Sequence, residues 1–181
     1  MIRGTTSSGV APFFKGWQLG NERLVEAISP LSADQLALPV GSAAWPIWSS
    51  VSHIAGARAM WLCVVFGEPG LETTPFTEAI FESGWEDELD HPRRADELVH
   101  ALESTWKIVE HCLATWTPES LGLEARRVRG DEVQLHTRQS VLYRLLTHDA
   151  YHTGEISLTL GSAGLGEVDL WRGLARIVPQ A

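Results

Sequence analysis

Cysteine is scarce in this chain of 181 residues, with only Cys63 and Cys112 present. Two cysteines cannot build the several disulfides that stabilise small secreted proteins, so the sequence favours a reducing compartment. Long apolar runs are also missing: no stretch reaches the roughly 20 residues of a membrane-spanning helix. The N-terminal segment MIRGTTSSGVAPFF lacks the apolar core of a signal peptide. We therefore expect a cytoplasmic, soluble protein with no membrane partner.

Basic residues are outnumbered as well, with 14 Lys and Arg against 23 Asp and Glu and a formal net charge of −9. Binding to a phosphate backbone requires a clustered basic surface, so we expect no nucleic-acid partner. The one basic run is RRVR, at 126–129. It is too short for a nucleic-acid patch, and it is either a solvated loop or a site for one carboxylate or phosphate of a small ligand.

Strand patterns are equally sparse, whereas apolar residues recur at helical spacing in four long segments. The predicted helices cover 12–28, 45–67, 92–116 and 138–162. Ser32 and Gln35 form a capping box that marks a short helical turn. The one extended segment is 124–136, an irregular hairpin or loop around Gly130-Asp131.

These elements predict an all-α four-helix bundle with a long crossover between helices 2 and 3. The length of the chain is typical of a single domain, here residues 1–181 with a loose N-terminal tail at 1–11. The crossover, 68–91, is acidic, with one helical turn predicted at 77–83. It is either a solvated connection or a segment that covers a site. A short C-terminal helix that packs on the bundle is predicted from Trp171, Leu174 and Ile177.

The last predicted helix contains His148 and His152, which lie four residues apart. That spacing is about 40° around a helix axis, so both imidazoles leave the same face and can bind a single ion. They belong to a predicted buried stripe that also holds Val141, Leu145, Glu155, Ile156 and Thr159. Buried imidazoles without partners cost about 1 to 3 kcal/mol for each unsatisfied group, and a metal ion removes that cost. The alternative is a pair of core imidazoles hydrogen-bonded to neighbours.

His53 is the candidate for a third metal ligand. It lies in the first half of the 45–67 helix, with Trp48 and Trp61 close by in the sequence. The two tryptophans either wall a pocket or belong to the core. Three other histidines have ordinary predicted roles. His100 and His111 are predicted on the surface of the third helix, and His136 in a loop.

The segments WSSVSHIAGARAMW and LLTHDAYHTGEISLTLGSAG together resemble the DinB/YfiT-like metalloenzyme superfamily. The resemblance spans nearly the whole chain, and its most specific part is the closing His-x-x-x-His-x-Gly-Glu. It implies a four-helix bundle in which His53, His148 and His152 bind one divalent ion, usually zinc or nickel, with positions left open for water or substrate. Members with an assigned activity are similar to thiol S-transferases that use mycothiol, bacillithiol or glutathione, or to mycothiol-dependent maleylpyruvate isomerase. Glu155 stands where many members have Gln.

A site of three neutral imidazoles keeps the charge of its ion and acts as a strong Lewis acid. We therefore predict that a low-molecular-weight thiol binds as a metal thiolate and attacks an electrophilic small molecule. Glu155 is expected to orient a ligating histidine or to accept a proton, with Asp149 and Arg144 as further supporting candidates. A homodimer is compatible with the resemblance and with the small residues on the opposite face of the last helix. These residues are Thr147, Ala150, Gly154 and Ser157.

Three other interpretations compete with thiol transfer. A metal-hydroxide hydrolase would use the same histidines with water in place of the thiol. A zincin-type peptidase is disfavoured because HDAYH has Asp for the Glu of HExxH, and only Glu155, Glu167 and Asp169 remain as later acidic ligands. A non-enzymatic bundle that binds metal for structure or stress sensing would need a fourth ligand such as Glu155, because neither cysteine lies near the histidine motifs in sequence.

Overall fold

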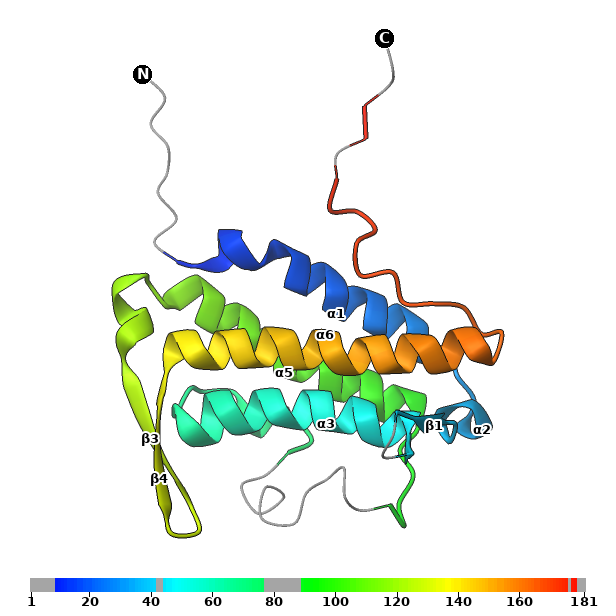
Figure 1. The fold of residues 1–181 in the computed structure, drawn as a ribbon, viewed down its shortest axis with the longest axis horizontal. Helices are drawn as coiled ribbons and strands as arrows, with labels where there is room; N and C mark the ends of the chain where they lie inside the picture. Colours follow the sequence, from blue (N-terminus) through cyan, green and yellow to red (C-terminus); the bar gives the residue numbers. More distant parts are fainter. Residues whose placement is uncertain (1–8, 42–43, 77–88, 176, 179–181) are drawn as a thin grey trace.

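The computed structural model describes residues 9–41, 44–76, 89–175 and 177–178. Within these ranges the fold is built from four long helices, and the predicted helical bundle is confirmed (Figure 1). The four helices are α1 (Lys15–Ile28), α3 (Ile47–Ala59), α5 (Ala95–Thr115) and α6 (Arg138–Ser162). Shorter helical pieces are η1 (Ala11–Phe14), α2 (Ala33–Leu36), η2 (Met60–Val65), η3 (Leu71–Thr73) and η4 (Glu119–Gly122).

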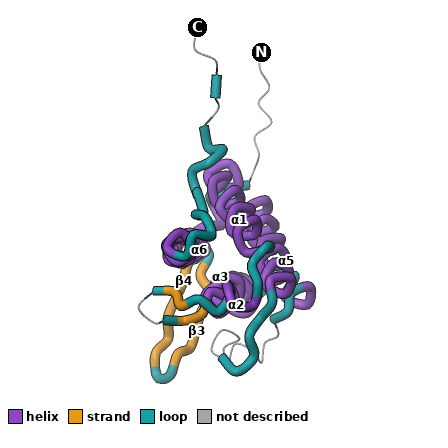
Figure 2. The backbone as a smooth tube through the Cα atoms, turned by 90° about the vertical axis from the view of Figure 1, so that its right-hand side faces the viewer, coloured by secondary structure: helices purple, strands orange, loops and turns teal. Residues whose placement is uncertain are grey.

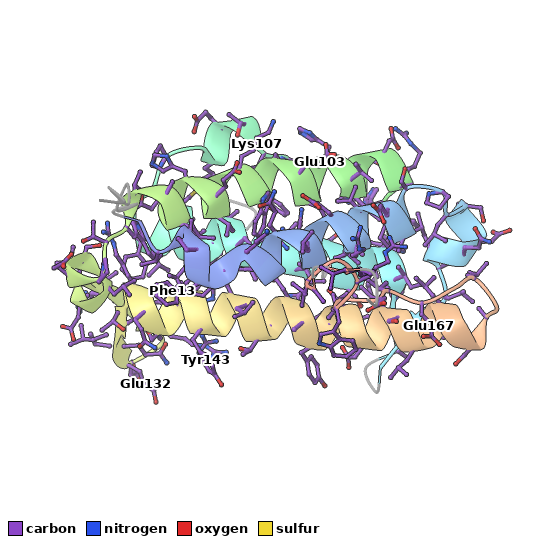
Figure 3. The ribbon with its side chains drawn as sticks, turned by 90° about the horizontal axis from the view of Figure 1, so that it is seen from above. Phe13, Glu103, Lys107, Glu132, Tyr143 and Glu167 are labelled. Atoms are coloured by element: carbon purple, nitrogen blue, oxygen red, sulfur yellow. The ribbon has the colours of Figure 1, made fainter. Side chains whose placement is uncertain are left out.

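The long helices form a bundle that Figure 2 shows nearly end on. Helix α3 packs on α5 and α6, and α1 packs on the same two helices. In Figure 1 the chain runs in the same direction along α3 and α5 and in the opposite direction along α6. The link between α3 and α5 includes residues 77–88, outside the described ranges, so the predicted crossover and its helical turn at 77–83 stay predictions.

Two buried clusters make up the core. One lies where α1, α3 and α5 meet α2, and includes Leu24, Ile47, Trp48, Ile54, Leu98, Leu102 and Ile156. The other lies toward the opposite end of the bundle and includes Trp17, Trp61, Leu62, Cys112, Trp116, Val141 and Leu145. Trp48 and Trp61 are therefore core residues, exposed by only 2% and 3%, rather than walls of an open pocket.

Helix boundaries follow local capping signals. The predicted limits of α6 are confirmed: Thr137 Oγ1 accepts the Ser140 N–H at 3.1 Å at its start. The capping box of α2 is also present, with Ser32 and Gln35 as predicted. Helix α5 begins three residues later than expected, because the Glu97 side chain accepts the Arg94 N–H at 2.9 Å and sets the N-cap there.

The second helix begins at Ile47, and the prediction of a start near Trp45 is wrong by two residues. Trp45 and Pro46 form strand β2 (Trp45–Pro46), which pairs antiparallel with β1 (Pro39–Val40). Pro46 has extended backbone angles, φ −64° and ψ 153°, and serves as the N-cap. Pairing with a segment that closely precedes it in the chain therefore overrides the helical preference of a proline in the first turn.

The predicted hairpin is present, as β3 (Glu124–Arg129) paired with β4 (Glu132–Thr137). Its turn contains Gly130 with φ +58°, which favours glycine. Side chains on one face are half-buried: Ala125, Arg127, Gln134 and His136. The face that holds Val128, Val133 and Leu135 is exposed. His136 thus lies on a strand and not in a loop, whereas His100 and His111 are on the surface as predicted.

The predicted C-terminal helix is absent from the described residues. Trp171, Leu174 and Ile177 lie in turns and irregular chain, with exposed fractions of 77%, 51% and 94%. Asp169 accepts the Trp171 N–H at 2.9 Å and so stabilises a turn, and Gly173 has a φ of +87° that interrupts helical geometry. Among the described residues, no helix is long and apolar enough to cross a bilayer. Residues 1–8 of the predicted tail lie outside the described ranges.

Candidate metal centre

The three predicted histidine ligands meet between α3 and α6. His53 projects from α3 toward His148 and His152 of α6, and their ligating nitrogens lie within 4.8 Å of one another. The ring centroid of His53 is 4.7 Å from that of His148 and 5.1 Å from that of His152, and the latter two are 4.6 Å apart. Because α6 runs against α3, a single position on α3 faces two successive turns of α6 (Figure 1).

The His148 ring is not satisfied by ordinary neighbours. Its Nε2 lies 2.9 Å from Nε2 of His53, a distance at which one ring donates a hydrogen bond and the other accepts it, or both rings give a lone pair to a cation. Its Nδ1 is buried and has no hydrogen-bond partner among the described residues. The closest acidic oxygen is Oδ1 of Asp149 at 3.8 Å, which is beyond hydrogen-bond distance. A pair of core imidazoles satisfied by their neighbours is therefore not what the structure shows.

His152 is oriented by Glu155 one turn further along α6. Nδ1 of His152 and Oε2 of Glu155 are 2.9 Å apart, so a neutral ring donates from Nδ1 and keeps its Nε2 lone pair for a ligand. Burial and the neighbouring His148 lower the pKa of His152 and outweigh the opposing effect of Glu155. The environment thus favours the uncharged form that a metal ion requires.

Glu155 lies against Gly41, the residue that follows β1. Gly41 has φ +63°, and a Cβ atom added there would lie 2.6 Å from Oε1 of Glu155, so only glycine allows this approach. Thr159 Oγ1 donates to the Pro39 carbonyl at 3.3 Å and ties β1 to α6. A cavity of about 570 Å³ opens beside Glu155, lined by Leu38, Pro39, Gly41, Leu158, Thr159, Ser162 and Ala163.

Behind the histidines lies a buried polar network that joins Asp149, a predicted supporting residue, to Arg58 and Trp17, for which no such role was predicted. Asp149 is buried, and its Oδ2 accepts from Arg58 Nε at 2.9 Å, from Arg58 Nη2 at 2.7 Å and from Trp17 Nε1 at 2.7 Å. Arg58 is 1% exposed and also donates to Asn21 Oδ1 at 2.7 Å. The sequence signal for a buried role of Arg58 is that it is the one charged side chain in the apolar helix segment HIAGARAMWL. A charge that is buried in such a segment needs a partner of opposite charge.

The buried stripe of α6 is rotated from its predicted position. Its members are Val141, Leu142, Leu145, Asp149, Thr153, Ile156 and Leu160. The histidines lie at the edge of this stripe, with side-chain exposures of 22% for His148 and 18% for His152. The histidines were predicted on the buried stripe, and the structure places them half-buried at its edge. Partial exposure leaves the histidine group reachable for a small molecule.

Several predicted supporting residues lie elsewhere. Arg144 does not touch the histidines, because its guanidinium packs over the ring of Trp61 at 4.8 Å from the ring centroid. Trp45 contacts His53, with 5.5 Å between ring centroids. Asp169 is engaged in its own turn with Trp171. No further His, Cys, Asp or Glu joins the three histidines among the described residues, which argues against a peptidase with a third acidic ligand.

The two cysteines are both buried and free of disulfides. Burial raises the pKa of Cys63 to about 11, with Glu72 and Glu68 contributing in the same direction. Burial also raises the pKa of Cys112. Thiols of this kind are poor nucleophiles and poor ligands near neutral pH, and both lie outside the histidine group.

Comparisons with known proteins agree with this fold. A family model described as "DinB family" matches residues 1–170. A solved DinB-like protein from Bacillus cereus aligns with a TM-score of 0.62 and 16% identity, covering 88% of this chain and 95% of its own. YfiT from Bacillus subtilis, described as a probable metal-dependent hydrolase with an unusual four-helix bundle topology, aligns with a TM-score of 0.60 and 16% identity, covering 91% of each chain. Among curated proteins, none matches the chain.

Proposed function

The chain belongs to the DinB family, and from this membership and the three convergent histidines we propose that it is a metal-dependent enzyme. In this proposal His53, His148 and His152 hold one divalent ion, zinc or nickel, and a low-molecular-weight thiol attacks an electrophilic small molecule beside it. The observation that carries the proposal is the convergence of three ligating nitrogens, from two helices, within 4.8 Å.

The residues present fit such an ion. Imidazole is a common ligand of zinc and of nickel. His53 and His148 direct Nε2 atoms at each other across 2.9 Å, and a cation between them accepts a lone pair from each ring. The same ion takes the Nε2 lone pair of His152, whose Nδ1 is already bound to Glu155. One cation would therefore take a lone pair from each of the three rings, whereas a hydrogen bond between two rings requires one of them to donate a proton.

A divalent ion held by three neutral imidazoles keeps its charge and lowers the pKa of a thiol or water that binds beside it. The protein residues have defined parts in this scheme. Glu155 fixes the ring orientation and tautomer of His152 through their 2.9 Å contact. Asp149 is engaged with Arg58 and Trp17 through Oδ2, so it supports α6 from behind rather than joining the ligands.

The arrangement also supports an open site. Structural zinc is normally enclosed by four protein ligands, often including Cys. Here the acidic neighbours, Glu155 and Asp149, are each engaged by another side chain, and both cysteines lie outside the group. With three protein ligands, positions remain for a small molecule, which favours catalysis over a purely structural or sensing role.

The first test is the metal content of untagged protein. We expect one zinc or nickel per chain by elemental analysis, and loss of that ion in His148→Ala. His111→Ala is the matched control, since His111 is exposed and lies on α5. Equal metal content in the two variants would contradict the assignment of the ligands.

The second test is turnover. Metal-loaded protein is assayed with mycothiol, bacillithiol and glutathione against a broad panel of electrophiles, and the assay is repeated after chelation. We expect a rate that depends on both metal and thiol and that disappears in His148→Ala. Metal-replete protein without turnover for any thiol would overturn the transferase proposal.

A second candidate is a metal-dependent hydrolase at the same histidines. It is favoured by the structural similarity to YfiT, described as a probable metal-dependent hydrolase. Water would then take the place of the thiol, and Glu155 would be the carboxylate available to receive its proton. Omitting the thiol separates the two candidates: a hydrolase retains its rate, and a thiol transferase loses it.

A further inference from the structure

Two guanidinium groups and one imidazole lie around Trp61 at the hairpin end of the bundle. The guanidinium carbons of Arg127 and Arg144 lie 5.0 Å and 4.8 Å from the Trp61 ring centroid, and the His136 ring is 4.6 Å away, centroid to centroid. These side chains come from three elements, β3, α6 and β4. We call Arg127, Arg144 and His136 the cationic cluster.

Within the described part of the chain, neither arginine of the cluster has a negative partner. The guanidinium groups of Arg127 and Arg144 form no ion pair and no hydrogen bond there. By contrast, Arg58 pairs with Asp149 and Arg138 pairs with Glu68. Burial lowers the pKa of Arg127, and the neighbouring cations Arg129 and Arg144 lower it further. Unpaired, mutually repelling cations are unexpected in a chain with a net charge of −9.

Its position is in line with the histidine group. Trp61 follows His53 by eight residues, about 12 Å along the helix axis, and Arg144 precedes His148 by four residues, about 6 Å. Because α3 and α6 run in opposite directions, both steps lead toward the hairpin (Figure 1). Between the two groups on α3 lies Ala57, half-buried and with a small side chain. The separation between the two groups is thus one that a ligand of modest length could span.

We infer that the cationic cluster binds a carboxylate of the thiol substrate whose sulfur reaches the histidine group, an inference that rests on the proposed function. Guanidinium groups bind carboxylates in a planar, two-point geometry. The Trp61 ring holds both arginines by cation–π contact, so they are arranged before the ligand arrives. Arg144 is exposed and gives access, while the half-buried Arg127 and His136 strengthen the interaction by excluding water.

The experiment compares two probes of equal length, 6-mercaptohexanoate and 6-mercaptohexanol, in cobalt-substituted protein. Sulfur binding to cobalt gives a charge-transfer absorption band, from which each dissociation constant is measured without turnover. We expect the carboxylate probe to bind about fivefold to tenfold more tightly, the value of a partly exposed ion pair. Arg144→Gln should remove this preference. Arg126→Gln removes a positive charge from the exposed face of the hairpin, and the preference for the carboxylate probe should remain.

The outcomes separate the two proposals. Equal affinity of both probes for the wild-type protein would overturn the cluster as a carboxylate site while leaving the metal centre intact. Failure to bind cobalt would overturn the proposed function; the cluster is then tested by titrating metal-free protein with hexanoate and following the His136 ring by NMR. A purely structural role for Arg144 predicts a lower melting temperature in Arg144→Gln with the preference unchanged. A measurement that needs no variant is added potassium chloride, which should reduce the preference in wild-type protein.

Discussion

The buried pair of Arg58 and Asp149 leads to the most specific prediction about stability. Replacing Arg58 with Met keeps an unbranched side chain of similar length but removes the guanidinium. It deletes contacts of 2.9 Å and 2.7 Å to Asp149 and one of 2.7 Å to Asn21. Asp149 then stays buried, with the Trp17 indole N–H at 2.7 Å as its remaining donor.

Removing one partner from a buried ion pair costs about 3 to 5 kcal/mol, because the other charge is left without compensation. For a chain of this size each kcal/mol corresponds to a change of about 2 to 4 °C in the melting temperature. We therefore expect Arg58→Met to melt about 6 to 20 °C below the wild-type protein. The exposed pair of Arg172 and Glu26, with side-chain exposures of 62% and 57%, provides the control. Arg172→Met should lose less than about 1 kcal/mol.

The assay is urea unfolding of metal-free protein, monitored by tryptophan fluorescence and circular dichroism, with thermal melts in parallel. The double variant Arg58→Met with Asp149→Asn should recover about 1 to 3 kcal/mol relative to Arg58→Met alone, because the stranded carboxylate is gone. Our reasoning would be refuted if Arg58→Met lost no more free energy of unfolding than Arg172→Met. It would also be refuted if the double variant were less stable than Arg58→Met.

Three further predictions concern the site and its surroundings. Glu155→Ala should weaken zinc binding by about 10-fold to 100-fold, as measured by chelator competition. Glu155→Gln should weaken it less, because its amide oxygen still accepts from His152. Equal zinc affinity of Glu155→Ala and the wild-type protein would contradict the orienting role. Gly41→Ala places a Cβ atom 2.6 Å from Glu155 Oε1, whereas at Gly130, where φ is +58°, an added Cβ meets no atom within 4 Å. In urea unfolding, Gly41→Ala should therefore lower the free energy of unfolding more than Gly130→Ala does. The reverse order would be inconsistent with the contact. Burial, followed by Arg144 and Arg127, lowers the pKa of His136. As the pH falls from about 6.5, the unfolded chain therefore takes up the proton first, and the wild-type protein loses stability relative to His136→Gln. NMR titration should show that the pKa of His136 rises in Arg144→Gln, and an unchanged pKa would exclude Arg144 as a cause.

Local features of the chain could be read without coordinates. The limits of α6 depend on Thr137 before the helix and on the glycines after it, and these act within one helical turn. The placement of His148 and His152 on one face follows from the helix itself, whatever packs against it. The hairpin at Gly130 is equally local, since its turn and its alternating side chains lie within a short segment.

Contacts between residues of different elements could not be read in the same way. Trp45 and Pro46 were expected to begin a helix, and pairing with Pro39 and Val40 holds them in a strand instead. Arg144 was expected near the histidines because it lies one turn before His148, yet its long side chain reaches Trp61 on the neighbouring helix. In both cases a tertiary or non-adjacent contact decided between two conformations of similar local cost.

By itself, then, the amino-acid sequence determined the four long helices, the caps of α2 and α6 and the pair of imidazoles on α6, because backbone preference and helical periodicity involve residues a few positions apart. Only the tertiary structure decided that His53 stands 2.9 Å from His148 across 95 positions of the chain, and that Asp149 turns away to a buried Arg58. The physical reason is that the rotation and depth of each helix are set by packing all apolar surfaces at once. Rotating a helix by the angle of one residue moves a side chain from the core to the edge of a site.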